Sequence, residues 1–291
     1  MPSSSSARHF LMAAVCVMGL FALLPTARAA FHLALHDDRY LQVIVAPVAC
    51  AFLLFWRRAQ IFTESRYSAK SGIPLFVAAT LFGILLQDQG RQASADGPPI
   101  VVAALLGIWL GAFYLCYGLN TIRAALYPLA CLLLAIPVPP GWMDRVAAGL
   151  QSGSASLSYA ILRVSGVPVF RQGMVFSLPH LNFEVGPECS GIHSSMALIM
   201  IAVIAGYVYL RSGLSRLAVI LLTIPIALFK NAVRIVTISL LGAYINRSFV
   251  DGPFHHRYGG LVFSMLGGFL FVLLLIALQR AEQRVGTFRQ Y

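Results

Sequence analysis

Long apolar stretches constrain the fold of this chain more than any other feature of its sequence. A helix needs roughly 20 residues to cross a bilayer, and by this measure the candidate spans are 9–27, 40–56, 73–88, 98–118, 124–139, 191–210, 216–246 and 258–279. Of the 291 residues, 59% are hydrophobic and 11% are charged, which leaves too little polar surface for a soluble globule. We predict an all-α fold, a polytopic membrane helical bundle of about eight transmembrane helices.

Basic residues indicate the orientation of these spans. Segments 57–72 and 211–216 and the C-terminal tail carry Arg and Lys, and all three fall on one side if the spans alternate. Lys and Arg resist translocation, so that side is predicted to be cytoplasmic. Segments 28–39, 88–97 and 140–190 then face outward from a bacterial inner membrane. The net charge of +11 is scattered and forms no basic stripe, which argues against nucleic acid as a partner.

The first span has two interpretations, and both remain open. Arg8, an apolar run and the sequence TARAA suit either a membrane span or a signal-like segment over residues 1–29, with Ala27 and Ala29 at the small-residue cleavage positions. Either interpretation places Ala30 outside.

The outward segment 140–190 contains two further predicted elements. Residues 144–163 have an apolar edge at Val146, Leu150, Leu157 and Ile161 opposite a Ser/Gln-rich side, which favours a helix lying in the outer interface. Alternating residues on both sides of Pro179 predict two short strands, a β-like hairpin on the outer face. No internal repeat or composition break divides the chain, so we predict a single polytopic membrane domain over residues 1–291.

A polar cluster, FEVGPECSGIHSS at 183–195, lies at the start of the span 191–210. Cys189 is the one cysteine of five with polar neighbours; the others lie in apolar runs and are expected to act as small buried hydrophobes. Free N–H groups at a helix start favour a thiolate and can hold an oxyanion. Two interpretations stay open here: a reactive thiol, or a capping cluster in which Glu188 or Ser190 satisfies the first turn.

The span 216–246 contains Lys230, Asn231 and Arg234. Arg234 follows Leu217 by 17 residues, or ~26 Å of helix, which is close to the ~30 Å hydrocarbon thickness and places Arg234 at the outer boundary. Asn231 lies one turn earlier on the same face. We expect Arg234 to face inward rather than snorkel, whereas Lys230 reaches the headgroups easily.

Histidines provide the remaining candidates. His255 and His256 in DGPFHHRYGG lie just before the last span, on the predicted outer side. Histidine readily exchanges protons near neutral pH, so they are either an acid/base group or two solvated loop residues. His193, four residues after Cys189 on the same helix face, is a rival base. Cys189, His193 and His255 lack the paired spacing of a zinc site, and we predict neither metal nor cofactor.

Three motifs resemble those of one family. PECSGIHS at 187–194, NAVRI at 231–235 and HHRYGGLVF at 255–263 are similar to the cysteine, arginine and histidine motifs of the exosortase/archaeosortase family. The resemblance covers about residues 130–280, a family-like catalytic core. It implies a membrane cysteine peptidase or transpeptidase with sortase-like chemistry.

The resemblance also implies a substrate and roles for the residues. Exported proteins would be cleaved at a C-terminal sorting signal, as in PEP-CTERM proteins: a short motif such as Pro-Glu-Pro, a hydrophobic helix and a basic cluster. Cys189 would be the nucleophile, Arg234 the oxyanion or thiolate partner and His255 the general acid/base. The auxiliary candidates are His256, Glu188, Asn231 and His193. The other implied partners are membrane lipids and a polysaccharide or lipid-linked acceptor.

The competing class is a non-enzymatic protein, such as a transporter subunit or an assembly factor for envelope polysaccharide. Intramembrane charges and broken helices also mark transporters, and Pro225 lies within the span 216–246. Transport sites, however, gather near the midplane, whereas Cys189, Arg234 and His255 are predicted at one boundary. Glu184 and Glu188 have two open roles, orienting the histidine or capping the helix.

Overall fold

The structure is a computed structural model, and it describes residues 5–22, 24–37, 40–63, 65, 68, 72–74, 76–78, 80–82, 85, 97–252 and 259–288. Its contacts divide the chain into two compact units, residues 1–140 and 141–291, and each is described by itself. The expectation of one polytopic domain over residues 1–291 stays a prediction.

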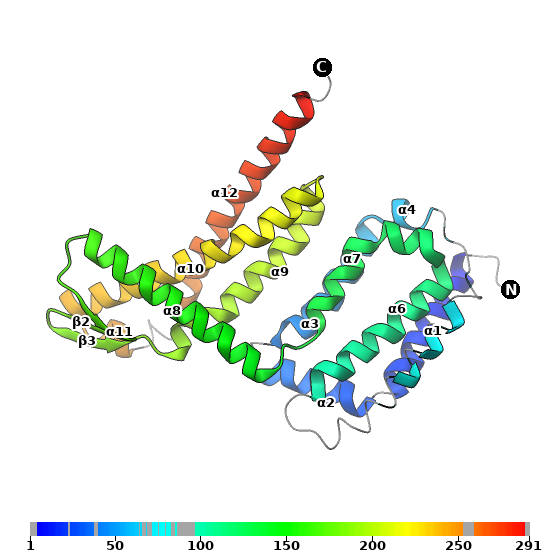
Figure 1. The fold of residues 1–291 in the computed structure, drawn as a ribbon, viewed down its shortest axis with the longest axis horizontal. Coiled ribbons are helices and arrows are strands. Elements are labelled where there is room, and N and C mark those ends of the chain that lie inside the picture. Colours follow the sequence, from blue (N-terminus) through cyan, green and yellow to red (C-terminus); the bar gives the residue numbers. More distant parts are fainter. Residues whose placement is uncertain are drawn as a thin grey trace. The chain divides into compact units, whose positions relative to one another are not determined.

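The first unit is helical (Figure 1). Its elements are α1 (Ser5–Ala22), α2 (Leu24–His36), α3 (Gln42–Trp56), α4 (Arg58–Ile61), α6 (Gly97–Ala124), α7 (Leu126–Cys131) and the 3-10 helix η2 (Leu132–Ala135). Helix α6 packs against α1 and α2, and α3 packs against α7 and η2. Cys50, Cys116 and Cys131 are buried here, as expected for cysteines in apolar runs.

The N-terminal region differs from the sequence expectation. A single span was predicted at 9–27 and a loop at 28–39, but α1 ends at Ala22 and α2 continues to His36. Pro25 explains the new helix, because proline lacks the N–H that continues a helix but is well tolerated in a first turn. The predicted loop is therefore wrong for residues 28–36.

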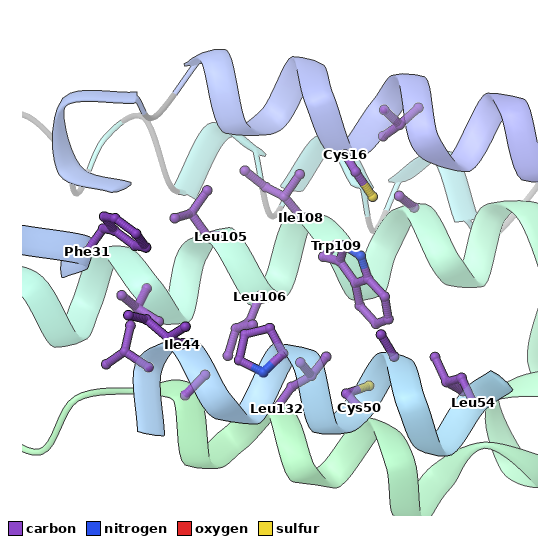
Figure 2. A pocket seen from close by; sticks show the side chains of 17 residues that line it. Cys16, Phe31, Ile44, Cys50, Leu54, Leu105, Leu106, Ile108, Trp109 and Leu132 are labelled. Atoms are coloured by element: carbon purple, nitrogen blue, oxygen red, sulfur yellow. The ribbon is translucent and has the colours of Figure 1, made fainter. Parts of the chain in front are cut away.

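The first unit also contains a cavity of about 700 Å³ between α1, α2, α3, α6 and η2. Figure 2 shows that its labelled lining side chains are apolar or aromatic apart from two cysteines. Cys16 and Cys50 lie here among residues such as Leu106, Trp109 and Leu132. The described lining residues include no acid, base or amide, so none of them offers a partner for cysteine chemistry.

The second unit combines long helices with a small sheet (Figure 1). Its elements are α8 (Pro140–Val164), β1 (Phe170–Gln172), β2 (Val175–Leu178), β3 (Leu181–Glu184), the 3-10 helix η3 (Pro187–Ser190), α9 (Ile192–Tyr209), α10 (Gly213–Tyr244), α11 (Ser248–Asp251) and α12 (Gly259–Phe288). Helix α10 packs against both α9 and α12. Leu198, Val219 and Phe271 are buried members of the core that these three helices share.

The connection between α9 and α10 is tightly capped. Ser212 is the N-cap of α10, and its hydroxyl accepts a 3.0 Å hydrogen bond from the Ser215 N–H. The Glu282 carboxylate on α12 accepts the N–H groups of Arg211 and Ser212 at 3.0 and 2.8 Å. The Arg216 guanidinium donates two bonds to the Leu210 carbonyl. These contacts satisfy backbone groups that helix ends leave without partners.

Helix α8 packs against α10 through its Ser/Gln-rich side, and not through the apolar edge that the sequence pattern indicated. Ser154 and Ser158 are fully buried, and the Ser158 hydroxyl lies 3.3 Å from the Ala232 carbonyl of α10. A Cβ added at Gly153 would come within 3.1 Å of Leu228 on α10. Val146, on the apolar edge, is 49% exposed. Small residues at the contact let two helix backbones approach closely, as is common in membranes.

The segment after α8 forms a three-stranded antiparallel sheet in the order β1-β2-β3. Strands β2 and β3 pair from Val175↔Glu184 to Leu178↔Leu181, so Pro179 and His180 form the two-residue connection. His180 has a φ of 73°, the positive value that a type II turn requires at its second central residue, and proline is common at the first. The sequence predicted two strands here, and the structure adds β1 as a third.

Apolar helices long enough to cross a membrane establish a multi-pass membrane protein. Within the described residues there are four, Val102–Ala124, Ile192–Tyr209, Gly213–Tyr244 and Gly259–Arg284, or up to five if Leu126–Ala135 and Pro140–Val164 form one broken span. Helix α3 is apolar but shorter. The predicted total of about eight crossings is therefore not confirmed.

Candidate active site

Cys189 lies in a tight turn that leads into α9. The 3-10 helix η3 carries it, and its N–H donates to the Gly186 carbonyl at 3.0 Å. Gly191 then adopts a φ of 68° and serves as the N-cap of α9. Such a left-handed residue is usually glycine, because other side chains clash there. The sequence Cys189-Ser190-Gly191 therefore ends η3 and starts α9.

Helix α10 holds this turn by a direct hydrogen bond. The Asn231 side-chain amide, 3% exposed, donates to the Cys189 carbonyl at 2.6 Å. A Cβ added at Gly191 would lie 3.0 Å from Asn231 Cγ. The absence of a side chain at Gly191 thus allows Asn231 to reach the turn, and the predicted cysteine and arginine motifs meet at this contact.

The surroundings of Cys189 are largely apolar. The cysteine is 6% exposed and belongs to a buried cluster that includes Phe176 of β2 and Ile235 and Val236 of α10. Gln151 of α8 supports the strand end before the turn, because its amide donates to the Val185 carbonyl at 2.6 Å. Gln151 was not among the predicted site residues, because it lies on the Ser/Gln-rich side of α8, which was expected to be solvated.

Three other candidates lie on the elements that form this turn or contact it. Arg234 is half-buried on α10, three residues beyond Asn231 and on the same helix face. Glu188 lies in η3 beside Cys189. His193 is in the first turn of α9 and is exposed.

The two histidines of the histidine motif lie outside the described residues. Residues 253–258, which include His255 and His256, fall in a gap, and α12 begins just after them at Gly259. Among the residues that are described, no group of three or more His, Cys, Asp or Glu side chains is arranged to hold a metal ion. The acid/base role of His255 stays a prediction.

Lys230 is the polar residue whose role the sequence analysis did not find. It was expected to extend toward lipid headgroups, but it is 4% exposed and its ammonium donates to the Ser194 hydroxyl on α9. The expectation of snorkelling is therefore wrong. The sequence did contain an indication that Lys230 faces inward, because Lys230 is four residues before Arg234 and shares its helix face.

Comparison with known proteins identifies a family. The sequence model of a family described as transmembrane exosortase matches residues 33–272. This range contains the three motifs at 187–194, 231–235 and 255–263 and extends well before them toward the N-terminus. No curated protein and no solved structure matches the chain.

Proposed function

Since this chain belongs to the transmembrane exosortase family, we propose that it is a membrane-embedded cysteine protease or transpeptidase. Its substrates are exported proteins that end in a short motif, a transmembrane helix and a basic cluster. The observation that carries the proposal is the hydrogen bond from Asn231 to the Cys189 carbonyl. It holds the candidate nucleophile against the helix that bears Arg234.

The reaction begins with attack by the Cys189 thiolate on the carbonyl carbon of the scissile peptide bond. The new C–S bond places negative charge on the carbonyl oxygen. Arg234 and the N–H groups at the start of α9 stabilise this oxyanion. A histidine, His255 or its neighbour His256, gives a proton to the leaving amine as the C–N bond breaks.

The product of this first step is a thioester between Cys189 and the new C-terminus of the substrate. Attack by water regenerates the thiol and releases a shortened protein. Attack by an amine or hydroxyl of an envelope acceptor, such as a polysaccharide or lipid-linked sugar, instead transfers the protein to that acceptor. The same acyl-enzyme serves both outcomes, so the identity of the attacking group decides between protease and transpeptidase.

The proposed topology follows from the substrate. A protein anchored by its C-terminal helix presents its scissile bond at a membrane boundary, so the catalytic groups belong at the outer face of the inner membrane. The proposal includes about eight crossings, with α8 in the outer interface. The positively charged segment 211–216, which joins α9 to the first turn of α10 and carries Arg211 and Arg216, then faces the cytoplasm.

The test compares the C-termini of exported proteins by mass spectrometry in cells with the wild-type protein, with Cys189→Ala, and with the control Cys116→Ala. Cys116 is fully buried in the first unit, so its loss changes packing only. We expect hydrophobic, basic-ended tails to persist in the Cys189→Ala cells alone. Identical C-termini in all three, with the variants stably made, would favour the transporter or assembly class.

A further inference from the structure

Lys230 is a buried cation in the middle of a membrane-spanning helix. It is 4% exposed, and its aliphatic stem lies against α12, where a Cβ added at Gly267 would come within 2.9 Å of Lys230 Cδ. Gly267 therefore makes room for the lysine. An ionisable side chain inside a membrane is costly and usually has a function.

The Lys230 ammonium is connected to the cysteine turn through Ser194. It donates to the Ser194 hydroxyl, which lies 3.0 Å from the Gly191 carbonyl and donates to it. Ser195 donates to the same carbonyl at 2.8 Å. Gly191 is the left-handed residue that ends the turn. The hydrogen bonds from Lys230 through Ser194 therefore reach the C-terminal end of the turn.

Two adjacent residues of α10 thus hold the two ends of one turn. Asn231 binds the Cys189 carbonyl at the beginning, and Lys230 reaches Gly191 through Ser194 at the end. Fixing a turn at both ends restricts its backbone, and with it the direction of the Cys189 side chain. Such restriction speeds attack by a nucleophile, because less orientational freedom is lost on reaching the transition state.

We propose that Lys230 is a positioning residue, which acts through Ser194 to hold the Cys189 turn in the orientation for attack. The inference rests on the proposed function for its catalytic meaning. The positioning itself is measurable without substrate, since the Cys189 thiol is buried and a small reagent alkylates it only when the turn opens.

Two readouts on the purified full-length protein test the proposal. The first is the rate of alkylation at Cys189 by iodoacetamide, followed by peptide mass spectrometry. The second is kcat and KM for cleavage of a membrane-anchored peptide that carries a sorting signal. The variants are Lys230→Met, Ser194→Ala and the double variant. The control is Thr223→Val, which removes a buried hydroxyl that bonds within α10 to the Val219 carbonyl.

Loss of the charge-assisted hydrogen bond should speed alkylation about tenfold in each single variant, because a loosened turn exposes the buried thiol more often. We expect kcat to fall by a similar factor while KM changes little. The double variant should be alkylated no faster than the faster single variant, because both substitutions break the same connection. Thr223→Val should match the wild type in both readouts.

Additive effects in the double variant, or wild-type alkylation in well-folded single variants, would overturn the positioning role. If Lys230→Met does not fold, Ser194→Ala alone decides, because it removes one hydroxyl and leaves the helix intact. If the wild-type protein cleaves no sorting signal, yet the variants show the expected alkylation pattern, the proposed function is contradicted and the positioning role is not.

Discussion

The side-chain amide of Asn231 donates a 2.6 Å hydrogen bond to the carbonyl oxygen of Cys189, across 42 residues of sequence. Both residues are buried, so the bond is made away from solvent. A buried amide and a buried carbonyl each need a partner, and here each supplies the other. This contact joins the turn before α9 to the face of α10 that also bears Arg234.

Asn231→Asp tests this contact with almost no change in shape. The carboxylate has no N–H to donate, so it would place negative charge against the Cys189 carbonyl in a buried site. We expect the free energy of unfolding to fall by about 3 kcal/mol and cleavage to be lost. Asn182→Asp, at an exposed position on β3, is the control and should behave as wild type in thermal melting and activity.

Gly191→Ala tests the close approach of the turn to α10. Gly166 offers a matched control, because both glycines have positive φ, 68° and 75°, but a Cβ at Gly166 meets nothing within 4 Å. Gly166→Ala should cost only the backbone strain, about 1 kcal/mol. Gly191→Ala adds contact with Asn231 and should lower both the melting temperature and activity further. Equal melting temperatures for the two variants would contradict this arrangement.

Arg234→Lys separates charge from geometry. A lysine keeps the positive charge but lacks the planar fork of donors that an oxyanion needs. We expect kcat to fall about 100-fold, as when one oxyanion donor is removed, with the protein still folded. Arg280→Lys, at an exposed position near the end of α12, should leave kcat unchanged. Full activity of Arg234→Lys would exclude Arg234 from the mechanism.

The side of the membrane can be tested at the two ends of α9. His193, in the first turn of α9, and Leu214, in the first turn of α10, are both exposed. The 18 residues of α9 span ~27 Å, close to the thickness of the bilayer core. With the outer barrier opened, a membrane-impermeant thiol reagent should label His193→Cys in intact cells and Leu214→Cys only after lysis. The reverse pattern would invert the proposed topology.

The choice between His255 and His256 is open to direct measurement. His255 stands four residues before Gly259, as in the family's histidine motif, so we expect His255→Ala to abolish cleavage and His256→Ala to retain most of it. The pH dependence of kcat in His256→Ala should keep the acid/base limb of the wild type. If His256→Ala is the inactive variant, the roles are exchanged.

Sequence reading located the helices of the second unit closely, and the reason is physical. The spans predicted at 191–210 and 216–246 are observed as α9 (Ile192–Tyr209) and α10 (Gly213–Tyr244). Long apolar runs identify membrane helices because the bilayer sets their length, and the Ser212 cap marks a start that local chemistry alone determines. At the N-terminus, Pro25 divides the helices in a way that hydropathy alone does not show.

By itself, the sequence determined that this is a multi-pass membrane protein, that it belongs to the exosortase family, and where Cys189 and Arg234 stand along their helices. Only the tertiary structure decided which way the polar side chains turn. In a mostly apolar chain, hydropathy contrast does not choose helix contacts; small residues and buried hydrogen bonds do. For that reason Ser158 packs inward on α8, Lys230 binds Ser194, and Asn231 holds the turn of Cys189.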